Sequence, residues 1–353
     1  PNRDEYNQLY YGLRVLIRYR LAAGILAYGF LKFFPEQAPL PSLSHLNTNY
    51  GDFTAWKLFS ISLGVVPGYE SFLGAVELAA GLLLLYRKTT TLATLIIIPF
   101  TGNVFFSNLA YEGGEALYSF YLISLALFLF AFDAVRLFTL VSLEKKTYPN
   151  QFQPHFVTWQ KYARIMVKTG FFFVFIFFYG YTIYAAHRQG SYQYPQQAGL
   201  AQAAGLYNVR EFKKNGQIIP YSQTDSSRWR DVVFEKWATI SIRTNQPAWL
   251  DGRNTEEIYV KDQDRTYESA GTTGRHYYAY QIDSVRHELH VKSKNPVVPT
   301  SLTWHYQRPA PGIIVLSGLD QQHDSLRVVL EKRDKKYLIF EAQKTGRRKG
   351  LTL

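Results

Sequence analysis

Five long runs of apolar residues occupy the first half of this chain, each bounded by charge or by proline, and they limit what it can fold into. The runs cover roughly residues 15–34, 69–86, 91–110, 117–138 and 169–186. A helix needs roughly 20 apolar residues to cross the hydrocarbon core of a bilayer, and each run is near that length. The runs also lack the polar face that a surface helix would show every 3.6 residues. The sequence therefore predicts a membrane α-helical bundle of five transmembrane helices.

The composition changes at about residue 188, beyond which Lys, Arg, Gln, Asp and Tyr are frequent. We predict a transmembrane domain over residues 1–188, a linker over 189–204 and a separate domain over 205–353. The net charge of +12 is explained by basic loops on one side of a membrane and by contact with anionic lipid, so nucleic acid is not an expected partner. The chain has no cysteine, which excludes disulfides, thiol catalysis and cysteine-ligated metals.

Basic and acidic residues alternate between successive loops. Lys and Arg gather before the first run, between the second and third, and between the fourth and fifth, as in Arg87 and Lys88. The opposite loops carry Glu36, Glu112 and Glu115. Short loops rich in Lys and Arg stay in the cytoplasm. With five spans, this predicts a membrane protein with a cytoplasmic N-terminus and a C-terminal domain on the opposite side of the membrane.

Charged residues within the predicted spans indicate a polar pocket in the outer half of the bundle. Charges inside a membrane are costly and usually face a protein interior or a wet cavity. Gly74 and Gly81 share a helical stripe with the carboxylates and would let another helix approach closely. The residues assigned to this pocket are Tyr28, Lys32, Glu70, Glu77 and Asn103. Two interpretations stay open: a structural ion pair between Lys32 and Glu77, or a ligand or proton site.

Two further features of this half carry expectations. Near the cytoplasmic ends of the helices, Asp133 and Arg136 are expected to pair with Arg18 or Arg20 as a structural charge cluster. The outer loop 35–68 contains a predicted interfacial helix over residues 53–63, which would cap the polar pocket.

Part of the helical half resembles a known family. The segment Gly24-x4-Gly29-Phe-Leu-Lys32 and, after a loop, Gly74-Ala-Val-Glu77-Leu-Ala-Ala-Gly81 resemble the DoxX family of bacterial four-helix membrane proteins, over about residues 12–140. The resemblance implies a four-helix core with polar positions at Lys32 and Glu77. It also implies a role as a subunit of a quinone-linked oxidoreductase, or as a membrane partner or assembly factor. The fifth run and the C-terminal domain are additions to the family's pattern.

From Gly205 onward, apolar and polar residues alternate with the period of a β-strand. Leu302, Trp304 and Tyr306 alternate with polar residues in this way, and Asn215-Gly216 favours a tight hairpin turn. Similar runs occur at about 207–212, 232–242, 277–282, 289–292, 313–316, 326–330 and 337–340. Eight or so antiparallel strands with one apolar face predict a sandwich or a closed barrel. Trp229, Trp237 and Trp304 are expected in its core rather than in a ligand cage.

Sequence motifs for catalysis are absent. His287-Glu-Leu-His290 lacks the spacing of a helical zinc motif, and residues three apart on a strand face opposite sides. We therefore expect no metal site, no cofactor, no catalytic residue and no turnover by this chain alone. The favoured function is an accessory or assembly subunit of a membrane complex, with membrane lipids and other subunits as partners. One alternative is a subunit of a quinone-linked oxidoreductase, and another is a periplasmic protein that binds a lipid or small molecule in its barrel.

Overall fold

The computed structural model describes residues 6–148, 154, 156–190, 192–254, 259 and 261–345. The chain divides into two compact units, each described by itself here. The helical unit contains residues 1–38 and 66–190, and the barrel unit contains residues 39–65 and 191–353. Residues 39–65, expected within the transmembrane domain, thus belong to the same unit as the strands.

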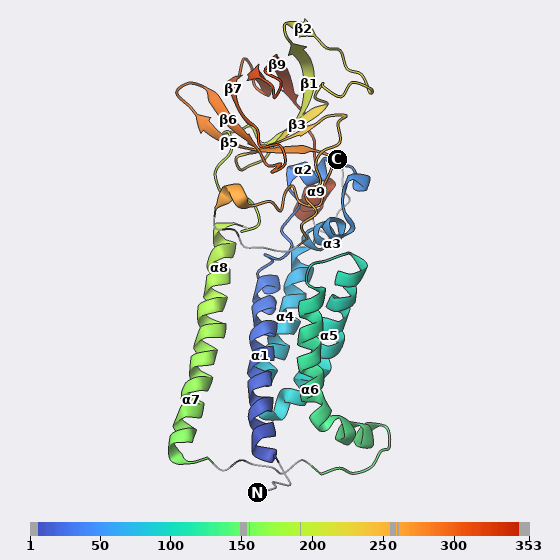
Figure 1. Cartoon of the computed structure of the whole chain (residues 1–353), viewed down its shortest axis with the longest axis vertical. Coiled ribbons are helices and arrows are strands. Elements are labelled where there is room, and N and C mark those ends of the chain that lie inside the picture. The colour runs from blue at the N-terminus through green and yellow to red at the C-terminus, as the bar shows by residue number, and fades with distance from the viewer. Residues whose placement is uncertain are drawn as a thin grey trace. The chain divides into compact units, whose positions relative to one another are not determined.

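All five apolar runs are helical, and their helices appear in Figure 1. They are α1 (Asn7–Phe33), α4 (Pro67–Leu84), α5 (Thr90–Ala110), α6 (Ala116–Val141) and the continuous α7 (Thr158–Phe172), η3 (Phe173–Phe178) and α8 (Tyr179–Gln189). A short η2 (Arg87–Thr89) precedes α5. Leu21, Ala80, Ile97 and Ala126 come from four different helices and meet in one buried core, so α1, α4, α5 and α6 form a bundle.

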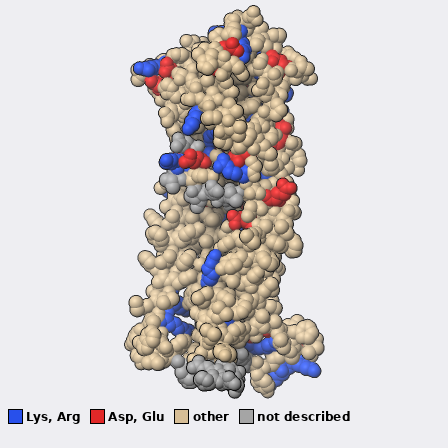
Figure 2. Space-filling view, viewed as in Figure 1, with Lys and Arg blue, Asp and Glu red and all other residues tan. Residues whose placement is uncertain are grey.

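The expected count of five transmembrane helices is not supported. Within the described residues, three helical segments are long and apolar enough to cross a membrane: 87–110, 116–141 and 158–189. A fourth would be counted if α3 (Ala55–Gly64) and α4 were one broken span. Charged residues explain why α1 and α4 are not counted by themselves: α1 carries three arginines and Lys32, and α4 carries Glu70 and Glu77. On the face drawn in Figure 2, most of the helical unit's surface still shows no charged group, as expected of a membrane protein.

Helix α4 approaches α1 closely through its glycines, as the stripe of small residues predicted. A Cβ atom at Gly74 would lie 2.7 Å from the backbone oxygen of Gly29, and one at Gly81 would lie 2.7 Å from Leu26 Cδ2. Helix α8 packs on α1 through Gly180, which lies beneath the ring of Phe30. Any larger side chain at these glycines would push the helices apart.

The strands of the barrel unit form one antiparallel sheet (Figure 1). Their order is β2-β1-β3-β4-β5-β6-β7-β8-β9, and β1 also pairs with β9. That pairing closes β1 and β3 to β9 into an eight-stranded barrel, which settles the choice between sandwich and barrel. The bounds are β1 (Gly205–Lys214), β2 (Gln217–Ile218), β3 (Asp231–Phe234), β4 (Thr239–Arg243), β5 (His276–Asp283), β6 (Glu288–Ser293), β7 (Ser301–Gln307), β8 (Ile313–Leu319) and β9 (Ser325–Lys332).

Side chains of the barrel's own strands fill its interior. Phe212, Trp229 and Trp304 belong to one buried core, against which Leu302 and Tyr306 pack. The expectation that Trp229 and Trp304 are core residues is therefore confirmed. Trp237 differs, because its ring stacks on Tyr194 in a separate cluster, with ring centroids 4.4 Å apart.

Several expected strand positions need correction. The run 232–242 forms two strands, β3 and β4, because residues 235–238 turn the chain. The run 337–340 lies at the start of a helix, α9 (Leu338–Thr345), although its alternation suggested a strand. The segment expected as a linker is also partly ordered, since Leu200 and Ala203 are buried in the barrel core. The hairpin at Asn215-Gly216 is confirmed, and positive φ angles of 53° and 78° suit its tight turn.

Residues 39–65 pack within the barrel unit through short, well-capped elements. They form α2 (Leu43–Leu46), η1 (Tyr50–Asp52) and α3, and the η4 turn (Asp262–Asp264) lies elsewhere in this unit. The Ser42 side chain accepts from His45 N at the start of α2, and Thr54 does the same for Lys57 N at the start of α3. Phe53 pairs with Thr272 in an antiparallel bridge. The expected interfacial helix thus exists as α3, and its buried residue Trp56 packs with Tyr194 and Tyr267 of the barrel unit.

Candidate functional site

The expected contact between Lys32 and Glu77 is present. Lys32 Nζ lies 2.6 Å from Glu77 Oε1, and both side chains are buried between α1 and α4. The rings of Tyr28 and Phe100 lie 6.0 and 5.7 Å from the same ammonium group. The pair is therefore enclosed by aromatic residues, which strengthens its attraction relative to water.

The polar groups of Glu70 and Tyr28, also assigned to this pocket, have different partners, although the Tyr28 ring lies beside the Lys32 ammonium. Glu70 is buried, but its Oε1 accepts from the backbone N–H groups of Gln37 and Ala38, each at 3.1 Å, and so caps the chain after α1. Asn103 is exposed on α5. The Tyr28 hydroxyl donates to Glu115 at 3.0 Å. Helical spacing placed these side chains at similar depths but could not fix the rotation of each helix.

The predicted inner charge cluster is only partly present. Asp133 and Arg136 lie 4.0 Å apart, and Asp133 accepts from the Thr91 hydroxyl. Among the described residues, neither Arg18 nor Arg20 forms an ion pair with Asp133. Arg20 contacts Tyr118 instead. Tyr118 is near the start of α6, whereas Asp133 lies toward the other end of that helix. The expected pairing with Arg18 or Arg20 is therefore wrong.

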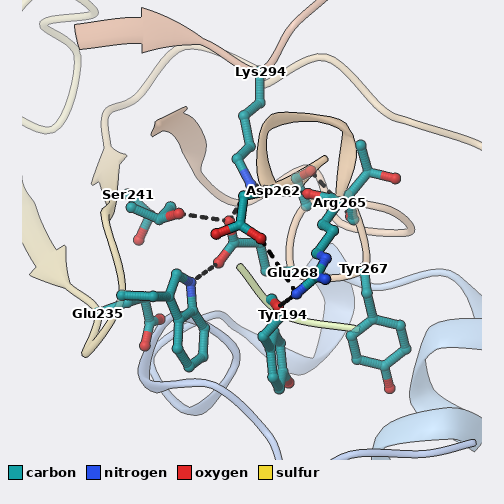
Figure 3. Close-up of polar contacts among 12 residues, drawn as sticks. Tyr194, Glu235, Ser241, Asp262, Arg265, Tyr267, Glu268 and Lys294 are labelled. Carbon is teal, nitrogen blue, oxygen red and sulfur yellow. Dashed lines mark hydrogen bonds and ion pairs between the residues drawn. The ribbon is translucent and has the colours of Figure 1, made fainter. Parts of the chain in front are cut away.

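A group of buried charges that was not predicted lies in the barrel unit. It joins residues 39–65 to the strands, and Figure 3 shows its centre. We call it the polar clamp. Its buried charged and aromatic members are His45, Lys57, Tyr194, Glu235, Tyr267, Glu268 and Arg275, and they are joined by Lys294, whose side chain is 4% exposed.

Glu235 holds the first turn of α2. Its Oε1 accepts from both the Ser44 backbone N–H, at 2.7 Å, and the Ser44 hydroxyl, at 2.6 Å, while Oε2 accepts from the Leu43 N–H at 3.2 Å. A carboxylate at the start of a helix satisfies donors that have no partner within the helix. Burial nevertheless dominates and raises the pKa of Glu235 to about 7.

Glu268 is the centre of the polar clamp (Figure 3). Its Oε2 accepts from Trp237 Nε1 at 2.6 Å, and its Oε1 accepts from the Thr239 hydroxyl at 2.8 Å and from Lys294 Nζ. The Glu268 carbonyl oxygen lies 3.0 Å from His45 Nε2. Burial, and then the charge of Lys57, lowers the pKa of His45 well below its ordinary value, so this imidazole stays neutral.

Lys57 reaches from α3 into the same cluster and is fully buried. Its ammonium donates to the Tyr267 carbonyl oxygen and lies 3.5 Å from the centre of the Tyr267 ring. A desolvated cation over an aromatic face is stabilised by about 2 kcal/mol. Tyr267 also bonds through its hydroxyl to Ser60, at 2.7 Å, so α3 is fixed by two of its side chains.

Arg275 completes the polar clamp at the start of β5. Its Nε donates to the Ser241 hydroxyl at 2.8 Å, its Nη1 to the Asn47 carbonyl oxygen at 3.0 Å, and its Nη2 to Asp231. The guanidinium thereby links β4, β3 and the chain after α2. All three links are between groups of this chain, which is typical of a structural arginine.

Sequence reasoning missed the polar clamp because its members lie far apart in the chain. One signal was available: Lys57 and Glu235 each interrupt an apolar run, and buried charge of this kind requires partners. The identity of those partners depends on the packing of residues 39–65 against the strands, which no local pattern encodes.

A cavity borders the polar clamp at one end of the barrel. Its volume is about 330 Å³, and the β4–β5, β6–β7 and β8–β9 connections contribute Trp249, Asn295 and Gln321 to its wall. Arg275 and Lys294 also line it. The cavity is large enough for a small polar molecule, and its lining offers both hydrogen-bond donors and aromatic rings.

One group of side chains could hold a metal ion. Ligand atoms of Asp283, Glu288 and His290 lie within 4.8 Å of one another on the outer face of β5 and β6, although no metal site was expected. His287, the residue that suggested a motif in the sequence, lies in the preceding turn with its ring against Tyr306. The set arises from cross-strand pairing of Asp283 with Glu288.

Comparison of the chain with protein-family models, with curated proteins and with solved structures finds no match. The resemblance to the DoxX family therefore depends on the short motifs around Lys32 and Glu77 alone.

Proposed function

We propose that this protein is an accessory or assembly subunit of a membrane complex, and that its barrel unit is a docking module. The observation that carries this proposal is that the buried polar groups of the barrel unit bond to other groups of the same chain. Glu235, Glu268 and Arg275 bond to the chain's own donors and acceptors, and the barrel interior is filled by its own side chains. Such a unit offers a surface to a partner rather than a chamber to a substrate.

One end of the barrel has the features of a docking surface. The β4–β5, β6–β7 and β8–β9 connections share this end because neighbouring strands run antiparallel. These connections and the end of β8 carry several exposed apolar side chains: Trp249, Leu250, Val297, Val298 and Leu319. Grouped exposed apolar residues, unlike isolated ones, are typical of protein contact sites.

Site-specific photocrosslinking in intact cells tests this proposal. A photoreactive residue at Val297, which is 68% exposed, should yield one discrete adduct with a partner protein. The matched control is Val285, which is 92% exposed in the β5–β6 turn at the other end of the barrel, and should not yield that adduct. Identical adducts from both positions, or none from Val297, would refute the docking role.

The proposed setting is the bacterial inner membrane, with the N-terminus in the cytoplasm and the barrel unit in the periplasm. The alternation of basic and acidic loops supports this orientation. The DoxX-like motifs support an accessory role, since members of that family act as subunits or partners in membrane complexes. The proposed partners are other subunits of such a complex and membrane lipids.

A quinone-linked oxidoreductase subunit is the second candidate. It is favoured by Glu77, whose Oε2 is buried and has no hydrogen-bond partner among the described atoms, while Oε1 pairs with Lys32. A quinol hydroxyl could donate to this free oxygen. Titration of the purified protein with a fluorescent quinone analogue should then show saturable binding that Glu77→Gln weakens.

The third candidate, a protein that binds a lipid or small molecule inside its barrel, needs a different location. Core side chains such as Trp304 and Phe212 occupy the interior, so the 330 Å³ cavity at the barrel end is the proposed binding space. Gln321→Leu would test this role, because it removes a polar group from the cavity wall outside the polar clamp and should weaken the binding of any polar ligand there.

A further inference from the structure

A crevice in the helical unit gathers positive charge near the start of α1. Arg14 and Arg18 of α1 and Arg87 of η2 line it, and its volume is about 20 Å³. Tyr11, Val15 and Leu129 form the rest of its wall, together with Thr90. A space of this size holds a water molecule or one or two oxygen atoms of a larger group.

Two donors on residues that line this crevice have no partner. The Nε atoms of Arg14 and Arg18 are shielded from solvent and make no hydrogen bond to any atom that the structure describes. A buried donor without an acceptor costs about 1–3 kcal/mol, and more when it is charged. The Arg14 guanidinium also stacks on the Phe132 ring, 3.3 Å from its centre, so its plane is fixed.

The charge around the crevice is not balanced. Arg18 and Arg87 act as repelling charges on Arg14, and Arg164 acts in the same way on Arg18. Asp133 attracts Arg14, but it accepts from Thr91 and lies 4.0 Å from Arg136. Three cations therefore line a small space, with Arg164 as a further repelling charge on Arg18 and Asp133 as the one carboxylate that attracts Arg14, an arrangement that an external anion would stabilise.

We propose that this crevice binds the phosphate group of an anionic membrane lipid. The guanidinium fork matches phosphate geometry and donates two parallel hydrogen bonds. Phosphate oxygens would satisfy the Nε donors of Arg14 and Arg18, while Tyr11, Val15 and Leu129 contact the adjoining apolar part of the lipid. The proposal depends on insertion in a membrane and is independent of the docking role of the barrel unit.

The full chain, purified in a neutral detergent, provides the test. Added phosphatidylglycerol should raise Tm and remain bound in native mass spectra, whereas phosphatidylcholine should do neither. The double variant Arg14→Gln/Arg18→Gln should bind phosphatidylglycerol at least about tenfold more weakly, since hydrogen bonds to charged groups are lost. Arg136→Gln is the matched control, because this half-exposed arginine pairs with Asp133 outside the crevice and should leave binding unchanged.

A second measurement separates lipid binding from a merely structural role. Without lipid, Arg14→Gln should raise Tm, because it removes a repelling charge and an unpaired donor; a structural arginine would instead lower Tm when replaced. The proposal would be overturned if the two lipids had equal effects or if the double variant bound phosphatidylglycerol as well as the wild type does. It would also be overturned if Arg14→Gln had a lower Tm without lipid, or if the same concentration of inorganic phosphate raised Tm equally.

Discussion

At the scale of single residues, buried charges are held by partners from distant parts of the chain. Glu77 and Glu235 illustrate two outcomes. Glu77 has a lysine partner at 2.6 Å, whereas Glu235 has three neutral donors and remains so deeply buried that its pKa is raised to about 7. The two carboxylates should therefore respond in opposite ways when their charge is removed.

Glu77→Ala should destabilise the helical unit by about 3–5 kcal/mol, because it leaves the Lys32 ammonium buried without its partner. Thermal unfolding in detergent measures this loss. Adding Lys32→Met to the variant should recover most of it, since the double variant buries no charge. A single variant as stable as the wild type would show that water reaches the Lys32 side chain.

Glu235→Gln should alter how stability depends on pH. The pKa of Glu235 is raised from 4.5 to about 7, so between these values the native state keeps a proton that the unfolded chain has lost. The free energy of unfolding therefore falls as pH rises through this window, by about 3 kcal/mol at about 1.4 kcal/mol per pKa unit. The measurement is Tm as a function of pH from 4.5 to 8, for both proteins. The Tm of the wild type should fall over this range relative to the Tm of Glu235→Gln. Parallel curves would contradict a raised pKa.

At the scale of secondary-structure elements, the sequence predicted which helices and strands exist better than it predicted which of them contact one another. All five apolar runs are helices, and most strand runs lie within a few residues of the observed strands, because periodicity reports which faces are buried. The run 337–340 was predicted as a strand but lies at the start of a helix, because four alternating residues are too few to distinguish the period of a helix from that of a strand.

The pairing of Lys32 with Glu77 followed from glycine stripes that bring α1 and α4 together. The polar clamp could not be predicted, because Glu235 meets Ser44 only through tertiary packing.

The contact between α3 and the loop before β5 depends on Gly271. This residue has a φ of 72°, its carbonyl accepts from the Thr54 N–H at 2.9 Å, and an added Cβ would lie 2.7 Å from Thr54 Oγ1. Gly271→Ala should lower stability by about 1–3 kcal/mol through backbone strain and this clash. Gly252→Ala is the matched control, because a Cβ there meets nothing within 4 Å. Thermal unfolding and proteolysis of residues 39–65 should distinguish the two variants, and equal behaviour would argue against strain at Gly271.

At the scale of the whole molecule, the chain combines a helical unit with a closed barrel, and passes between them three times. The segment 39–65 leaves the helical unit after α1 and returns to it before α4. The segments 39–65 and 191–353 belong to one compact unit, so we expect both to lie on the same side of any membrane that the helical unit crosses. This agrees with the proposed periplasmic location of loop 35–68 and the barrel unit.

Protease added to intact spheroplasts should cleave within the barrel unit and leave the N-terminal region protected. The reason is the excess of Lys and Arg in the loops before α1, between α4 and α5, and between α6 and α7. Immunoblotting with antibodies to each end of the chain measures the outcome. Protection of the C-terminal half until the cells are lysed would reverse the proposed orientation.

The division of the barrel unit between two separated segments sets the timing of its assembly during synthesis. Residues 39–65 leave the ribosome before the whole of 66–190, yet Lys57 and Ser44 have no strands to pack against until the second segment follows. At about 5–20 residues per second, this delay is on the order of tens of seconds before β9 can close on β1. During that interval the nascent 39–65 segment lacks the groups that its buried polar side chains bond to in the folded unit. A fragment that starts at residue 191 would lack the donors for Glu235, so the barrel expressed alone should misfold even though it contains every strand.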